Sequence, residues 1–498
     1  MALRSLPHRP SFEHLRNEAR ELQRRLREGD PSALAVAREF HPRFLERAEH
    51  FGLSDAQLTV ARSYGYPGWP KLKAYVEAIT AYTRNPGQVR PQDEPAEEFL
   101  RLACLTYGGD DLSHPARAAE MLQGDPSLAG HSIHTAAAVG DAPAAERMLR
   151  ADRSLATVSG GPFGWEPLMY VAYSRLVSDD PRHSHVAVAR LLLENGADPN
   201  AGYLWDGTYL FTALTGAFGY GEDSPNQPPH HESIAVARLL LEAGADPNDD
   251  QTIYNRHFRP DNDYLELLLA HGLGKARRGP WPKRLGDHLA EPEQLPEDAL
   301  VFAADKDDYA ERVALLLRHG VDPDGRGTQH RALKGMRPIE RAHVGGARRN
   351  FDLLLAGGAR PPAEDPVDTL LGLCMQGQQE AVRREISNDP ELAAATIGRH
   401  PGALVDAAER GNIKGVALLA EIGYDVNLGR IGQAALHLAA YAGNRELCEL
   451  LIGLGGDPNL EDNAFHAPAS GWARHAHHDD LASWLKEIEQ QTVAGAGP

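Results

Sequence analysis

The chain has 498 residues, of which 42% are hydrophobic, and its 51 Lys and Arg against 70 Asp and Glu give a net charge of −19. This length exceeds one ordinary hydrophobic core, so we expect several domains or an extended repeat array. The apolar content excludes disorder throughout the chain. The acidic balance argues against nucleic acid as the main partner, because phosphate binding needs a basic face.

The sequence also argues against secretion and membrane insertion. Its first ten residues lack the apolar run of a signal peptide, and no stretch approaches the ~18 consecutive apolar residues of a membrane span. The three cysteines, Cys104, Cys374 and Cys448, are an odd and sparse set that suits a reducing compartment rather than a disulfide framework. We therefore expect a soluble, cytoplasmic protein without membrane contact.

Residues 1–83 are predicted to form a separate helical segment, followed by a linker over residues 84–93. Asp30-Pro31 indicates a helix start, because proline is favoured at the first helical position. Residues 1–90 carry 15 Lys and Arg against 10 Asp and Glu, a net +5, which leaves −24 for the rest. This charge fits two alternatives. The segment could dock on the acidic chain that follows it, or its charges could form an ordinary solvated surface.

One phrase recurs along the remaining chain: a Leu-rich helix followed by Gly-x-Asp-Pro-Asn or a variant. The Leu residues form an apolar stripe, the Gly supplies the left-handed residue that ends a helix, and Asp-Pro turns the chain outward. Successive phrases end 48, 76, 37, 66 and 32 residues apart, so the two widest gaps hold a further, weaker unit. They end at Asn200, Asn248, Asp324, Pro361, Asn427 and Asn459.

An Ala-rich helix precedes each Leu-rich helix, most clearly in QAALHLAAYAG at 433–443. The combination resembles the ankyrin repeat, with its TPLHLAA helix, a turn, a second helix containing LLL and a GADVN tail. Only His134 and His437 keep the structural histidine of that family in the first helix. Because the other units lose this hydrogen bond, we expect an array less regular than a consensus one.

The resemblance implies an all-α fold: an ankyrin-repeat solenoid of about 10–11 irregular repeats with short β-hairpin fingers over residues 94–490. Residues 491–498 should be a disordered tail. In the most regular unit we expect Leu450 to lie in the core. The phrase SDAQLTVARSYGYPGWPKLKAYVEA, which begins at Ser54, looks like the helical leader found ahead of many bacterial arrays. The chain thus resembles a bacterial, actinobacterial-type ankyrin-repeat protein.

One stretch, residues 163–264, stands apart because it holds 13 of the 33 aromatic residues. Two inserted loops, beginning at Ser174 and Gly219, fall between the first and second helices of adjacent units, so they should emerge side by side. Between them AGYLWDGTYLF predicts a β-hairpin that turns at Asp206-Gly207.

We take this stretch as the candidate surface for a partner or ligand, because amphipathic aromatic side chains are good binding anchors. Tyr203, Trp205 and Tyr209 should cluster at the hairpin tip and be exposed to solvent, which usually marks an interaction site. The alternative is that the aromatic side chains fill gaps left by lost alanines. The candidate residues are Trp165, Tyr170, Tyr173, Tyr203, Trp205, Asp206, Tyr209, Phe211, Tyr220, Tyr254, Arg256 and His257.

Ankyrin arrays mostly bind proteins through finger tips and the concave helix face, so the resemblance implies a protein-binding scaffold rather than an enzyme. The alternative is a small-molecule binder or a cofactor-free lyase or cyclase, of the dehydratase type, with an aromatic-lined pocket in residues 163–264. Its polar candidates for acid–base work are Asp206, Glu222, Asp223, Arg256 and His257.

No cofactor and no metal are expected. The sequence contains no Gly-rich phosphate loop, paired CxxC or GxSxG motif. His475, His477 and His478 beside Asp479 and Asp480 could suggest a metal site, but the simpler interpretation is a turn and a helix start, where Asp is favoured. His183 with His185, and His230 with His231, are interpreted in the same way as residues of inserted loops.

Overall fold

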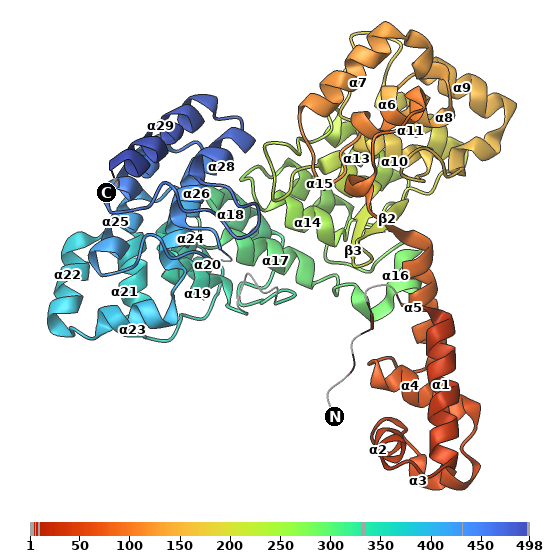
Figure 1. Ribbon diagram of the computed structural model, residues 1–498, viewed down its shortest axis with the longest axis horizontal. Coiled ribbons are helices and arrows are strands. Elements are labelled where there is room, and N and C mark those ends of the chain that lie inside the picture. Colours follow the sequence, from red (N-terminus) through yellow and green to blue (C-terminus); the bar gives the residue numbers. More distant parts are fainter. Residues whose placement is uncertain (1–3, 5, 8–9, 330–334, 431, 496–498) are drawn as a thin grey trace. The chain divides into compact units, whose positions relative to one another are not determined.

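The computed structural model describes residues 4, 6–7, 10–329, 335–430 and 432–495 (Figure 1). The chain divides into two compact units. Unit 1 comprises residues 1–222, 227–256 and 270–292, and unit 2 comprises residues 223–226, 257–269 and 293–498. Within the described ranges, no helix is long and apolar enough to cross a membrane. The expected helical architecture is confirmed, with many short helix pairs and one small sheet.

The N-terminal helices form their own hydrophobic cluster, centred on Leu15, Val60 and Leu72. As expected, Pro31 opens a helix, and the Asp30 carboxylate caps it by accepting from the backbone N–H groups of Ser32 and Ala33. The elements are α1 (Phe12–Arg27), α2 (Pro31–Phe40), α3 (Phe44–Arg47), η1 (Ala48–His50), α4 (Leu53–Ser63) and α5 (Trp69–Tyr82).

The predicted linker begins with a strand rather than free chain. Strand β1 (Thr83–Arg84) pairs in parallel with β2 (Gly202–Trp205), which pairs in antiparallel fashion with β3 (Tyr209–Thr212). The sheet order is β1-β2-β3. A short 3₁₀ turn, η2 (Pro86–Gln88), follows. The domain boundary near residue 83 stays a prediction, but the segment after it is tied to the hairpin.

Unit 1 continues with four helix pairs of the expected kind. Its first helices are short and rich in small residues, and α8 shows why: Ala136, Ala137 and Ala138 are all fully buried, which allows neighbouring helices to approach closely. The elements are α6 (Pro95–Ala103), α7 (Ser113–Gly124), η3 (Pro126–Gly130), α8 (Ile133–Val139), α9 (Ala142–Ala151), η4 (Arg153–Thr157), α10 (Pro167–Tyr173), α11 (His185–Glu194), α12 (Ala213–Phe218), α13 (Ser233–Glu242), α14 (Asp250–Arg256), α16 (Trp281–Leu285) and η5 (Gly286–His288).

Unit 2 holds six more pairs, while α15 (Asp263–His271) lies mostly within it. With the helices α14 and α15, the described residues therefore agree with about 10–11 repeats. The elements are α17 (Gln294–Ala303), η6 (Asp307–Tyr309), α18 (Ala310–Arg318), α19 (Pro338–Val344), α20 (Arg348–Ala356), α21 (Pro366–Met375), α22 (Gln379–Asn388), α23 (Leu392–Arg399), α24 (Ala403–Glu409), α25 (Ile413–Glu421), α26 (Ala435–Tyr441), α27 (Arg445–Gly453), α28 (Ala469–His475) and α29 (Asp479–Gly495).

Two expectations about the C-terminal end need correction. Helix α29 runs to Gly495, so residues 491–495 are helical where the sequence predicted a disordered tail, and residues 496–498 lie outside the described residues. In α27 the fully buried leucines are Leu447 and Leu451, whereas Leu450 is only partly buried against the same cluster. The buried face of α27 therefore lies one residue out of phase with the prediction from the sequence.

The asparagine that ends a repeat tail links that repeat to the next. The Asn427 side-chain amide donates to Gly455 O at 3.0 Å and accepts from the Asp457 backbone N–H at 2.8 Å. Asn200 makes the same two bonds to Gly244 O at 3.3 Å and Asp246 N at 2.9 Å. The amide suits this role because it carries a donor and an acceptor side by side.

The structural histidines make the expected bridges. His134 Nε2 donates to Val158 O at 3.0 Å and His437 Nε2 donates to Leu460 O at 2.9 Å. At the matching place in α12, Thr215 donates instead to the Asp249 carboxylate at 3.1 Å. A unit without the histidine therefore keeps a bridge by a different pair of side chains.

Replacing a fully buried leucine of α27 should cost far more than replacing its partly buried neighbour. We expect Leu451→Ala to lower the free energy of unfolding by about 2–5 kcal/mol and Leu450→Ala by about 1–2 kcal/mol, in line with its smaller buried area. Urea denaturation of the two variants, followed by circular dichroism, measures both. Equal losses would contradict the assignment of the buried face.

Asn427→Ala should remove both links to the next repeat and leave Gly455 O and Asp457 N without that partner. The expected loss of stability is about 1–3 kcal/mol, with hydrogen exchange accelerated in α27 through α29. Asn388→Ala, at the exposed end of α22, is the matched control and should change stability by less than about 0.5 kcal/mol. If both variants behave alike, the asparagine link carries little of the stability.

Candidate functional site

The two insertions of unit 1 lie side by side, as the sequence predicted. The Arg175 guanidinium, in the first, donates to Pro228 O of the second at 2.6 Å and to Gly216 O at 2.8 Å. The backbone N–H of His185 donates to the Glu232 carboxylate at 3.0 Å. Side-chain to backbone bonds therefore fix both loops to each other and to the helix between them.

The predicted hairpin is present with the predicted turn. Tyr203 pairs with Phe211 and Trp205 with Tyr209 across β2 and β3. Asp206 and Gly207, the two turn residues, have φ of 50° and 71°. They are the central residues of a tight turn that Thr208 N–H closes by donating to Trp205 O at 3.1 Å, and Tyr209 pairs with Trp205 beyond it. Both central residues are left-handed, which an Asp-Gly pair adopts readily.

The aromatic side chains of the candidate surface form an interior block instead of an exposed cluster. Ring centroids of Trp165 lie 5.4, 4.9 and 5.3 Å from those of Tyr170, Tyr173 and Tyr203. All four side chains are buried, and so is Phe211. The Tyr170 and Tyr173 hydroxyls donate to Gly160 O at 2.9 Å and Thr212 O at 3.0 Å.

The prediction that Tyr203 is exposed at the hairpin tip is therefore wrong. Tyr203 points inward because it lies on the face of β2 that packs on α10. Neighbouring aromatic rings surround its side chain there. Tyr209 is the member that reaches solvent, with 54% of its surface exposed, while Trp205 is half-buried. Gap filling by aromatic side chains thus accounts for most of the block.

The other side of the hairpin is covered by the chain itself. Leu204 of β2 packs with Ile79 of α5 and with Trp281 and Leu285 of α16 in one hydrophobic cluster. Trp281 also makes an edge contact with Tyr82, at 5.0 Å between centroids. The N-terminal helices and a segment some 200 residues later thus share one docking surface on this finger.

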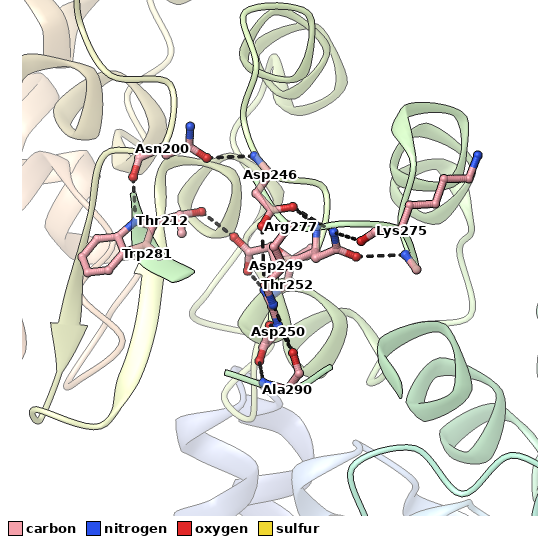
Figure 2. A network of polar contacts seen from close by, with 12 residues as sticks. Asn200, Thr212, Asp246, Asp249, Asp250, Thr252, Lys275, Arg277, Trp281 and Ala290 are labelled. Carbon is pink, nitrogen blue, oxygen red and sulfur yellow. Dashed lines mark hydrogen bonds and ion pairs between the residues drawn. The ribbon is translucent and has the colours of Figure 1, made fainter. Parts of the chain in front are cut away.

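Polar contacts fasten this covering segment to the repeat tails (Figure 2). Trp281 Nε1 donates to Asn200 O at 2.8 Å, and the Arg277 guanidinium donates to Asn248 O at 2.6 Å and to the Asp250 carboxylate at 2.7 Å. Asp250 in turn accepts from Ala290 N at 3.2 Å. Burial raises the pKa of the Asp250 carboxyl, and the charge of Arg277 lowers it. Asp250 and Arg277 therefore form an ion pair with a structural role.

Asp249 lies beside this network and caps α14. Its carboxylate accepts from the hydroxyls of Thr212 and Thr215 and from Thr252 N at 2.8 Å. Burial raises the pKa of the Asp249 carboxyl, and these donors act in the opposite direction. Every partner is a group of the fold, so the arrangement links two repeats rather than facing a substrate.

Two of the polar candidates for acid–base chemistry, Arg256 and Glu222, contact tyrosines of the same stretch in unit 1. The Arg256 guanidinium lies 4.9 Å from the Tyr220 ring centroid and donates to Phe218 O at 3.0 Å. The Tyr254 hydroxyl donates to Glu222 at 2.6 Å.

Two further polar candidates, Asp223 and His257, belong to unit 2. There His257 stacks on Phe302 at 4.0 Å, and Asp223 accepts from the Tyr441 hydroxyl at 3.0 Å. Asp223 and His257 thus have partners of the fold within unit 2.

The C-terminal histidines occupy the turn that the sequence predicted. His475 ends α28, His477 has a left-handed φ of 63°, and α29 begins at Asp479. His475 Nε2 lies 3.1 Å from the Asp223 carboxylate, and His477 Nε2 lies 2.7 Å from Asn226 Oδ1. These rings therefore already have polar partners within unit 2.

Exposed apolar side chains occur on two successive fingers of unit 2. Leu428, in the finger after α25, is 50% exposed, and Phe465, in the finger after α27, is 72% exposed. The fingers are adjacent, because a Cβ on Gly432 of the first would fall 2.5 Å from the Asn463 side chain of the second. Neither Leu428 nor Phe465 was singled out from the sequence, where each looks like any loop residue.

Comparison with protein families agrees with this geometry. The ankyrin-repeat family model in three copies matches residues 370–462, and the single ankyrin-repeat model matches residues 163–202. A comparison with curated proteins found no significant match. The chain is a mostly helical ankyrin-repeat protein, and repeats of this kind are generally protein–protein interaction modules.

The interior position of Trp165 and the exposed position of Tyr209 give a direct test. We expect Trp165→Ala to lower the free energy of unfolding by about 3–5 kcal/mol, whereas Tyr209→Ala should change it by less than about 0.5 kcal/mol. Thermal unfolding followed by far-ultraviolet circular dichroism measures both. A stable Trp165→Ala protein would show that the block is a loosely filled pocket.

Proposed function

We propose that the chain is a protein-binding module whose partner docks on the finger tips of its C-terminal repeats and on the concave helix face beside them. The observation that carries this proposal is the pair of exposed apolar side chains, Leu428 and Phe465, on adjacent fingers. Leu428 lies within residues 370–462, where the ankyrin family model matches. Phe465 lies three residues after the end of that range. Exposed apolar side chains on neighbouring fingers are typical anchors for a partner.

The charge around these fingers favours a basic partner. Residues 402–470 contain four Lys and Arg against nine Asp and Glu, a net charge of −5. One of the four, Arg430, is already paired with Asp406 and, at 2.6 Å, with Glu409. A protein segment that presents apolar side chains among Lys or Arg would complement this surface.

The aromatic stretch of unit 1 has a smaller part in the proposal. Its hairpin is covered on one side by α5 and α16 and packed on the other against α10, which leaves Tyr209 and the edge of Trp205 accessible. The alternative of a small-molecule binder or cofactor-free lyase is not favoured, because the rings that would line its pocket contact one another. The bacterial origin and cytoplasmic location stay predictions.

A selection from a random peptide library displayed on phage, with the full chain as bait, tests the site. We expect the selected peptides to be enriched in basic and apolar residues. Their affinity for the Leu428→Ala, Phe465→Ala double variant should fall by about tenfold or more, because hot-spot side chains contribute upwards of about 1–2 kcal/mol each. Both side chains are exposed, so the variant should unfold at the same temperature as the parent.

Tyr209→Ala is the matched control, since it also removes an exposed apolar side chain from a finger. It should bind the selected peptides as the parent does. Peptides that bind the double variant unchanged would contradict the proposed site. Peptides lost only in the Tyr209→Ala variant would move the partner surface to the hairpin of unit 1.

A further inference from the structure

Three histidines that are distant in the sequence converge where the two insertions of unit 1 meet. His185 is the first residue of α11, and His230 and His231 lie at the end of the second insertion. Each ring offers one nitrogen, and these three nitrogens lie within 4.8 Å of one another. The ring of His185 makes edge contacts with those of His230, at 4.6 Å, and His231, at 5.1 Å.

A carboxylate lies beside two of the three rings. Glu232 Oε2 lies 3.9 Å from His185 Nδ1 and 3.8 Å from His231 Nε2. The same oxygen accepts from the backbone N–H of His185 at 3.0 Å, which holds the carboxylate in place. The cluster thus presents three imidazole nitrogens and one carboxylate oxygen.

We propose that His185, His230, His231 and Glu232 form a zinc-binding site that fastens the two insertions of unit 1 to each other. Three nitrogens and one oxygen make up a four-ligand set of the kind that Zn²⁺ takes in tetrahedral geometry. Neutral imidazoles with a carboxylate and no thiolate suit a divalent metal of this group.

The surroundings of His185 already match those of a metal ligand. Its Nε2–H donates to Ala138 O at 2.9 Å, which fixes the tautomer and leaves the lone pair on Nδ1. With Nε2 carrying the proton, the ring can bind a metal through Nδ1 without losing a proton.

His230 supplies an observation of a different kind. Its ring is almost wholly buried, and Nε2 has no hydrogen-bond partner among the described residues. Buried polar atoms of this sort are uncommon and call for an explanation. Nδ1 of His230 accepts a hydrogen bond from Glu232 N at 2.9 Å, so the ring proton is on Nε2. When Nε2 coordinates a metal, the proton moves to Nδ1 and this hydrogen bond breaks.

The site therefore closes by a small rearrangement on binding. Ligand atoms about 2.0–2.1 Å from a tetrahedral zinc lie about 3.3 Å apart, compared with up to 4.8 Å in the cluster. His231 is exposed and Glu232 half-buried, so rotation of these two side chains supplies the movement. The positive charge of Arg175 opposes the metal, and the Glu232 carboxylate offsets it.

A second histidine group has to be removed before the site is measured. His477, His478, Asp479 and Asp480 line one open pocket at the start of α29 and offer donors of the same type. The parent for the experiment is therefore the full chain with His477→Ala and His478→Ala. His231→Ala removes a proposed ligand that is exposed, so the fold does not depend on it. His131→Ala, another exposed histidine of unit 1, is the matched control.

The experiment is a titration with Zn²⁺ alone in competition with a chromophoric chelator. We expect the parent to bind one Zn²⁺ per chain, His231→Ala to bind about tenfold or more weakly, and His131→Ala to match the parent. Zinc should also slow hydrogen exchange in residues 174–184 and 227–232 of the parent, and not in the His231→Ala variant.

Three outcomes would overturn the proposal. One is a parent that binds no Zn²⁺, which would place any affinity of the native chain at the α29 group. Another is a His231→Ala variant that binds as the parent does. The third is equal weakening in His131→Ala, which would show adventitious binding to surface histidines. Loss of the site would leave peptide binding at Leu428 and Phe465 untouched, so the two proposals fail separately.

Discussion

The fold depends on one side-chain amide, that of the asparagine at the end of a repeat tail. A helix pair of this size cannot bury its apolar face alone, so each repeat is stable only in register with its neighbour. Asn200 and Asn427 set that register by bonding a carbonyl and an N–H of the following tail, and Asn248 does the same towards Lys275 O and Gly274 N. Where the tail ends in Asp324, the carboxylate takes over by accepting from Arg360.

Unit 1 uses the same tails a second time. While the side chains of Asn200 and Asn248 face the next repeat, their backbone carbonyls accept from Trp281 and Arg277 of the covering segment. The finger that this segment covers is the one whose aromatic residues are most numerous. A surface that presents binding anchors elsewhere in such arrays is thus an internal junction here. The side chains that we propose for a partner, Leu428 and Phe465, are exposed on fingers of unit 2.

Much of this was accessible from the sequence, because it is local. The tail phrase, the Ala-rich helices, the Asp206-Gly207 turn and the adjacency of the insertions each follow from a short stretch and a known period. The exposure of the hairpin was not accessible, because Ile79 and Trp281, which cover Leu204, lie far away in the chain. Leu450 was placed on the buried face because a run of leucines leaves the helical phase open by one residue. The convergence of His185 with His230 was missed for the same reason as the covered hairpin.

The parallel pairing of β1 with β2 also dictates an order of events during synthesis. Thr83 and Arg84 leave the ribosome well before Leu204 and Trp205, and the α16 residues that complete the junction come later still. At ~5–20 residues per second, the ~200 residues between β1 and α16 take on the order of 10–40 s to make. Until residues 202–212 are made, the apolar face of α5 has no hairpin to cover it, and the junction stays incomplete until α16 follows. Helices α1 to α5 therefore emerge with one apolar side uncovered, and this side is where a chaperone would bind them.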